Sequence, residues 1–217
     1  MPDFALRRTT MVDTQVRPSD VTKFPIIAAM LVVPREVYVP NALREAAYVG
    51  ENLALGPGRV VLDPRTLAKM LDALDIQRAE MVLLLGAGLG YSAAVIARLA
   101  EAVIAVEEDA GLAAEAERTL SAEGVDNAMV MTAALAAGAA KHGPYDVIVI
   151  EGGVEQVPEA ILAQLKDGGR IGALHMERGV GVVRIGTRRA GATSWRDAFN
   201  AAAPVLPGFG RTRAFTL

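Results

Sequence analysis

The sequence contains no cysteine and only two histidines among its 217 residues. Without cysteine, disulfide bonds, thiolate metal sites and cysteine nucleophiles are excluded. The two histidines, His142 and His175, have no partners at the spacing of metal ligands, so no metal site is expected. Long apolar runs are lacking too, because Arg98 and Glu101 interrupt the most apolar region. We therefore expect neither a membrane span nor a signal peptide, and a cytoplasmic protein.

An excess of charge of one sign is also lacking. The chain has 22 basic and 25 acidic side chains, a net charge of −3. This balance gives no electrostatic reason to expect a nucleic-acid partner. Hydrophobic residues make up 52% of the chain, which is enough for a full core and argues against disorder.

From residue 81 onward, short apolar runs alternate with helix-forming stretches. The predicted strands are 81–85, 103–106, 127–131, 146–150, 170–174 and 179–188, and the tail 207–217 could supply the last one. The predicted helices are 91–100, 111–123, a stretch ending near Lys141, and 158–165, with Trp195 and Phe199 four apart on a further helix. Strands that are apolar throughout indicate a parallel sheet covered on both faces. We expect an α/β fold over 76–217 with a doubly wound, mostly parallel, Rossmann-like sheet.

The first 75 residues are predicted to form an N-terminal helical extension packed on this core. Asp63 followed by Pro64 is typical of a helix start, with a capping side chain and then proline. An apolar helix over 26–33 is bounded by prolines. Residues 1–18 are polar and unpatterned. They could be a loose tail, or an arm that packs on a partner subunit in a homodimer.

Three glycines occupy alternate positions just after the first predicted strand. Ligands of doubly wound sheets bind near this turn, and glycines let a ligand approach the main chain. A sharp turn without a ligand is the alternative. We expect the whole loop to bind a cofactor: Gly86, Ala87, Gly88, Leu89, Gly90 and Tyr91. This requires open space at the loop; if side chains such as Leu84 or Leu89 fill it, only a scaffold remains.

The pattern around the loop favours S-adenosylmethionine over NAD. A dinucleotide fingerprint needs a third glycine where Tyr91 stands. About twenty residues later come Glu107 and Glu108, where a carboxylate can accept hydrogen bonds from both ribose hydroxyls. A solvated acidic turn is the alternative for these two residues, and an NAD-dependent oxidoreductase is a weaker alternative for the protein.

Several motifs follow one another in order along the chain. They are VPREVYVP at 33–40, AY at 47–48, LGPG at 55–58, the glycine loop continued to 95, VE at 106–107, YDVIV at 145–149, VPEAIL at 157–162 and LKDGGR at 165–170. In this series the chain resembles the protein-L-isoaspartate O-methyltransferase family. The resemblance implies an S-adenosylmethionine-dependent enzyme that methylates the isoaspartyl carboxylate of damaged proteins. The carboxylate is already ionised at neutral pH, so no strong base is required. The protein would mainly supply alignment and a dry site.

The chain departs from the family pattern at four positions. Val60 and Leu62 replace the threonine and serine whose hydroxyls lie at the reaction centre in the family. Leu84 and Ala134 replace two acidic cofactor positions, so that only Glu107 remains. Losing two hydrogen bonds would weaken cofactor binding roughly tenfold to a hundredfold. The alternatives are therefore a different methyl acceptor or a non-catalytic relative.

No catalytic residue is assigned, but three candidates are expected near the substrate. Arg59 could bind an acidic substrate through two hydrogen bonds, with a surface arginine beside the helix cap as the alternative. Asp63 flanks the same region. Glu151 closes the fourth strand and could be a base or a polar contact to the acceptor; a solvated turn residue is the alternative.

Overall fold

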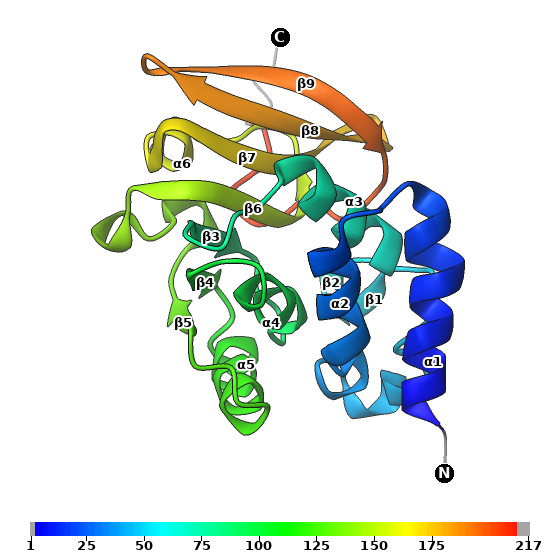
Figure 1. The fold of residues 1–217 in the computed structure, drawn as a ribbon. Helices are drawn as coiled ribbons and strands as arrows, with labels where there is room; N and C mark the ends of the chain where they lie inside the picture. Colours follow the sequence, from blue (N-terminus) through cyan, green and yellow to red (C-terminus); the bar gives the residue numbers. More distant parts are fainter. Residues whose placement is uncertain (1–2, 212–217) are drawn as a thin grey trace, which may run out of the picture.

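The computed structural model describes residues 3–211, and its centre is a seven-stranded sheet (Figure 1). The strands lie in the order β5-β4-β3-β6-β7-β8-β9. Their bounds are β3 (Met81–Leu85), β4 (Ala102–Glu107), β5 (Ala128–Thr132), β6 (Tyr145–Val154), β7 (Leu165–Glu177), β8 (Val180–Arg189) and β9 (Ala192–Asn200). Strands β3 to β7 pair in parallel, and β8 and β9 extend the sheet antiparallel. The expected mostly parallel α/β sheet is confirmed.

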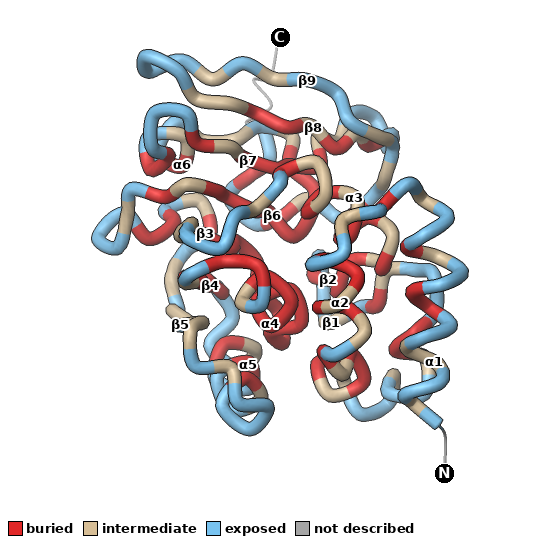
Figure 2. Tube along the Cα trace, viewed as in Figure 1, coloured by how far each residue is buried: buried red, intermediate tan, exposed pale blue. Residues whose placement is uncertain are grey.

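The central strand β3 is buried on both faces. Val82 and Leu84 belong to one core cluster, whereas Leu83 and Leu85 belong to the other. This division follows from the alternation of side chains along a strand. Figure 2 shows the resulting buried centre, whereas exposed residues gather on β9 and on the outer sides of α1 and α5. The unbroken apolar run in the sequence is thus explained by helices that cover both faces.

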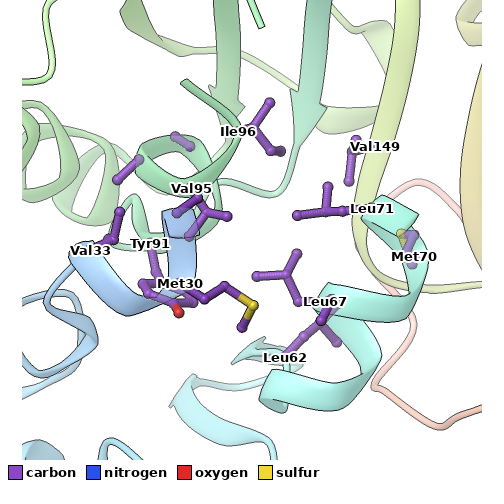
Figure 3. Close-up of a cluster of buried hydrophobic side chains, with 14 of the residues drawn as sticks. Met30, Val33, Leu62, Leu67, Met70, Leu71, Tyr91, Val95, Ile96 and Val149 are labelled. Carbon is purple, nitrogen blue, oxygen red and sulfur yellow. The ribbon is translucent and has the colours of Figure 1, made fainter. Parts of the chain in front are cut away.

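Helices lie at or near the predicted stretches and pack on the sheet or on one another. They are α2 (Phe24–Val32), α3 (Pro64–Leu74), α4 (Tyr91–Ala97), α5 (Ala110–Ala122) and the short α6 (Glu159–Leu162). At the start of α3, the Asp63 carboxylate accepts a hydrogen bond from the Thr66 amide at 2.9 Å. Figure 3 shows Leu67 and Leu71 of this helix meeting Met30 and Val95 in one apolar cluster. The predicted cap of α3 and its apolar face are confirmed.

The N-terminal stretch is helical rather than a loose tail. It forms α1 (Phe4–Met11), a π-helical turn (Val12–Val16) and a 3₁₀ turn (Arg17–Ser19). Met11, Val12 and Val16 are buried against the rest of this chain. The loose-tail interpretation is therefore wrong, because the polar residues hide a short apolar face that tertiary packing stabilises.

A buried polar trio attaches α1 to the chain after α2. The Arg8 guanidinium forms an ion pair with Glu36 at 3.3 Å and donates to the Tyr48 hydroxyl at 3.0 Å. The Tyr48 hydroxyl donates in turn to the Glu36 carboxylate. Burial raises the pKa of Tyr48, so its hydroxyl keeps the proton that this bond needs. The trio links three segments that lie far apart in the sequence.

We expect Tyr48→Phe to lower the free energy of unfolding by about 1–3 kcal/mol, because it leaves a buried carboxylate oxygen unsatisfied. Tyr38→Phe is the matched control, since the buried Tyr38 hydroxyl has no hydrogen-bond partner among residues 3–211. That control should lose no stability. Urea denaturation of both variants checks the prediction, and equal losses would contradict it.

The prediction of a helix that ends near Lys141 is wrong. Two 3₁₀ turns, Leu135–Ala137 and Ala140–His142, occur there instead. Gly138 breaks the stretch at φ 63°. The Gln164 side chain donates to the Ala137 carbonyl at 2.8 Å and accepts from the Ala139 amide at 2.9 Å. A long-range contact thus replaces the local bonds that a helix would have made.

Trp195 and Phe199 lie on β9, not on a helix as predicted. The register shift near Asp197 lets Trp195 pack with one core cluster and Phe199 with the other. Among the described residues, β9 forms the edge of the sheet. Residues 207–211 of the tail contain no strand, and 212–217 lie outside the described residues. Within the described part of the chain, no helix is long and apolar enough to cross a membrane.

Candidate functional site

The glycine loop joins β3 to α4 at the carboxyl edge of the parallel strands. Gly86, Gly88 and Gly90 have φ values of 87°, 56° and 97°, in the left-handed region that favours glycine. The amides of Gly86 and Ala87 both donate to the Val106 carbonyl of β4, at 2.9 and 3.2 Å. The turn itself therefore requires these glycines. All six predicted loop residues, 86–91, are buried.

Glu107, at the end of β4, lies directly beneath this loop. Its side chain is fully buried. One carboxylate oxygen accepts from the Gly88 amide at 2.7 Å and from Arg59. The other accepts from the amides of Glu108 at 2.9 Å and Asp109 at 3.1 Å. Glu107 is therefore no solvated turn residue but a buried anion with four donors.

The neighbouring predicted cofactor residues lie on the exposed rim of the same edge. Glu108 is exposed, and its carboxylate accepts from the Leu135 amide at 3.3 Å. Ala134, which precedes Leu135, is also exposed. The structure thus brings Glu108 and Ala134 together beside the buried Glu107.

Arg59 comes to this edge from a separate two-stranded hairpin, β1 (Leu53–Gly56) and β2 (Arg59–Val61). Only 7% of Arg59 is exposed, and its Nη2 forms the ion pair with Glu107. Its Nε and Nη1 have no hydrogen-bond partner among the described residues. The surface-arginine alternative is therefore wrong. The guanidinium faces the predicted ribose-binding carboxylate.

The main chain of the glycine loop is covered by side chains. A Cβ atom placed on Gly86 would lie 3.0 Å from Arg59 Nη1 and 3.4 Å from Leu206 Cδ1. A Cβ atom on Gly88 would lie 2.6 Å from Leu55 Cδ1. The expected open space is thus filled, although not by Leu84, which packs into the core. The covering groups come from the β1–β2 hairpin and from the segment after β9.

The sequence pattern did not indicate that this segment, residues 201–211, belongs to the site. The Leu206 amide donates to the Gly153 carbonyl at 2.9 Å, and the Gly153 amide donates to the Pro204 carbonyl at 2.8 Å. Leu206 also fits against the bare main chain of Gly152, where a Cβ atom would lie 2.5 Å from its Cγ. The paired glycines, Gly152 and Gly153, were the one local signal that another part of the chain approaches closely here.

Glu151 is buried within β6, so the solvated-turn alternative is wrong. Burial raises the pKa of its carboxyl to about 7, against the opposing charges of Arg59 and Arg35. Its Oε2 accepts no hydrogen bond from the described residues. A carboxyl that titrates near neutral pH suits proton exchange or a hydrogen bond to a ligand.

Arg35 completes a polar layer between the loop and the N-terminal helices. It is fully buried, donates to the Ala47 and Leu62 carbonyls, and lies 4.6 Å from the centre of the Tyr91 ring. Several buried polar atoms of this region have no hydrogen-bond partner among the described residues: Arg35 Nη1, Tyr38 OH, Arg59 Nε and Nη1, Tyr91 OH, Ser92 Oγ and Glu151 Oε2. Native interiors satisfy most such atoms, so their concentration beside the loop marks this region as a candidate site.

The other predicted positions are structural in this conformation. The Asp63 carboxylate caps α3, and the Asp63 amide donates to Asn52 at 2.9 Å. Leu62 is fully buried in the apolar core, and Val60 is partly buried beside it. No group of three or more His, Cys, Asp or Glu side chains among residues 3–211 could hold a metal ion.

The matching family model and two curated relatives of this chain belong to one family. The family model described as "Protein-L-isoaspartate(D-aspartate) O-methyltransferase (PCMT)" matches residues 7–178. A protein-L-isoaspartate O-methyltransferase of Syntrophus aciditrophicus (strain SB) is 35% identical over 189 residues, which cover 85% of this chain and 87% of that protein. Protein-L-isoaspartate O-methyltransferase 1 of Rhodopseudomonas palustris (strain HaA2) is 37% identical over 168 residues, 77% of this chain and 69% of that protein.

Solved structures share the fold at lower identity. A protein-L-isoaspartate O-methyltransferase superposes with a TM-score of 0.82 at 22% identity, over 94% of this chain and 67% of that one. A Plasmodium falciparum protein, described as a putative protein-L-isoaspartate O-methyltransferase in complex with S-adenosyl-L-homocysteine, gives 0.79 at 17% identity, over 92% of this chain and 97% of that one. These matches support the fold independently of the sequence motifs.

Proposed function

Because this chain belongs to the protein-L-isoaspartate(D-aspartate) O-methyltransferase family, we propose that it transfers a methyl group from S-adenosylmethionine to the isoaspartyl carboxylate of damaged proteins. The family match over residues 7–178 carries the proposal. It is supported by Glu107, a buried carboxylate placed beneath a glycine loop at the end of β4. We place the reaction in the cytoplasm and take the acceptor to be a protein or peptide.

The main chain and charges of the site fit an adenosyl group, whereas the covering side chains must move. The glycine loop would border the methionine part, Glu107 would accept the ribose hydroxyls, and the rim at Glu108 and Ala134 would lie beside the adenine. When bound, the cofactor supplies a methyl group on a positively charged sulfur. In the described conformation, the Glu107 carboxylate already forms an ion pair with Arg59.

This chain's residues would mainly orient the acceptor and exclude water. Leu55 and Leu206, which cover the loop, provide apolar surface for a dry site. We propose that Arg59 and Glu151 lie beside the acceptor, because a guanidinium can hold a carboxylate through two hydrogen bonds. Asp63 would act by fixing the start of α3. No strong base is needed, since the attacking carboxylate is already ionised at neutral pH.

A methyl-transfer assay with an isoaspartyl peptide tests the proposal. Methyl ester should form on this peptide and not on the same peptide with a normal aspartyl residue. Titration calorimetry with S-adenosylmethionine and S-adenosylhomocysteine tests the cofactor separately. If neither compound binds at millimolar concentration and no ester forms, the proposed function is wrong.

A further inference from the structure

The hydrogen-bonding capacity of Glu107 is fully used within this chain. A carboxylate offers about four acceptor positions. Arg59 and the Gly88 amide share one oxygen, and the Glu108 and Asp109 amides share the other. A diol that binds Glu107 must therefore displace one of these donors. Three of them are main-chain amides fixed by the loop and by the end of β4, so only the Arg59 side chain can leave.

The Arg59 guanidinium also fills the space in front of the loop. Its Nη1 lies 3.0 Å from the position of a Cβ atom on Gly86, nearer than the carbonyl oxygen of Glu151 at 3.1 Å. A ligand in contact with the Gly86 main chain would occupy the same volume. The ion pair and the steric contact of this one guanidinium thus lead to the same conclusion.

We propose that Arg59 acts as a latch on the cofactor site. Its guanidinium occupies the place at Glu107 where the ribose would bind, until an adenosyl ligand displaces it. This inference rests on the proposed function and adds a closed state to it. It makes Arg59 a residue that lowers the affinity for the cofactor, and it assigns a role to an arginine buried on an otherwise apolar hairpin strand.

A second buried carboxylate gives the displaced guanidinium another partner. Glu151 lies on β6 next to the loop, and its Oε2 accepts no hydrogen bond from the described residues. The charge of Arg59 already acts on this carboxyl. Arg59 can therefore have two states, paired with Glu107 or paired with Glu151. Neither state leaves the charge of Arg59 unpaired, as a two-state element requires.

Titration of S-adenosylhomocysteine into the native chain and into Arg59→Gln tests the latch. Glutamine removes the charge and shortens the side chain, so we expect affinity to rise by about tenfold to a hundredfold, the equivalent of one charge-assisted hydrogen bond no longer displaced. Arg170→Gln is the matched control. Arg170 pairs with Glu80 at 2.7 Å near the starts of β3 and β7, at the opposite edge of the sheet. The control should bind with native affinity.

Glu107 keeps three main-chain donors in Arg59→Gln, and a cooperative thermal transition must show that the variant folds. Should it not fold, Arg59→Lys retains a counter-charge with one ammonium group in place of the guanidinium fork, and an intermediate gain in affinity is expected. A crystal structure of the native chain with S-adenosylhomocysteine is a second readout, in which Arg59 should no longer contact Glu107.

The outcomes separate the latch from the proposed function. Equal affinity of the native chain and the folded Arg59 variant, or an adenosyl ligand bound with the Arg59–Glu107 pair intact, overturns the latch and leaves the methyltransferase proposal in place. Failure of the native chain and of every folded variant to bind S-adenosylhomocysteine overturns both. A gain in affinity for Arg59→Gln but not for Arg170→Gln supports the latch even if no methylation is detected.

Discussion

Glu107→Ala is expected to lower the free energy of unfolding by about 3–5 kcal/mol, the cost of leaving a buried charge without its partner. Arg59 is 7% exposed, and Glu107 is its one ion-pair partner among the described residues. The substitution also removes the acceptor for the amides of Gly88, Glu108 and Asp109. Urea denaturation followed by circular dichroism measures the loss.

A double variant shows whether the unpaired charge is the cause. Arg59→Leu together with Glu107→Leu removes both charges and should recover much of the stability lost in Glu107→Ala, because apolar pairs often replace buried ion pairs at little cost. Glu80→Ala is the control on the less deeply buried pair with Arg170, and its loss should be smaller. If the double variant is no more stable than Glu107→Ala, the unpaired charge is not the main cause of the loss.

Local signals in the sequence predicted much of this fold. The bounds of β3 were predicted from its apolar run, and the start of α3 from Asp63 and Pro64. Both features are fixed by near neighbours: this buried strand by its unbroken apolar run and the helix start by its cap. The parallel order of the sheet follows in turn from the alternation of strands and helices.

The failures occur where distant contacts override local preference. The alanine-rich stretch after β5 favours a helix, but Gly138 and the Gln164 side chain impose two short turns. Trp195 and Phe199 are four apart, a spacing that fits one face of a helix as well as a strand. The polar sequence of α1 hides its apolar face, because the helix is stabilised by packing rather than by propensity.

The same distinction holds for the site. The places of the loop and of Glu107 in the fold could be predicted, because the glycine motif and the end of β4 each depend on adjacent residues. The position of Arg59 could not, since its partner lies 48 residues further along the chain. Leu206 likewise reaches Gly152 from a segment beyond β9. The cover over the loop is thus a product of tertiary structure, and it turns an expected open cleft into a closed site.

Glu151→Gln is expected to make the protein more stable than the native chain above pH 7 and to remove a pH dependence. Burial raises the pKa of the Glu151 carboxyl from 4.5 to about 7 in the folded state. Between these values the folded state binds a proton that the unfolded state releases. The native chain therefore loses stability as pH rises through this window, by about 3 kcal/mol in total. Glutamine resembles the protonated carboxyl, so the variant should keep this stability as the pH rises.

Urea denaturation at pH 4.5, 6 and 8 measures this effect as the difference between variant and native chain. The advantage of Glu151→Gln should be smallest at pH 4.5, grow through pH 6 and level off above pH 7. Glu117→Gln, on the exposed face of α5, is the control, and its difference from the native chain should stay constant. A difference between Glu151→Gln and the native chain that is independent of pH would mean that the carboxyl is already ionised at pH 4.5, held by Arg59 or Arg35. Glu151 would then be the resting partner of an arginine rather than a neutral acid, and the two carboxylates beside Arg59 would compete for it before any ligand binds.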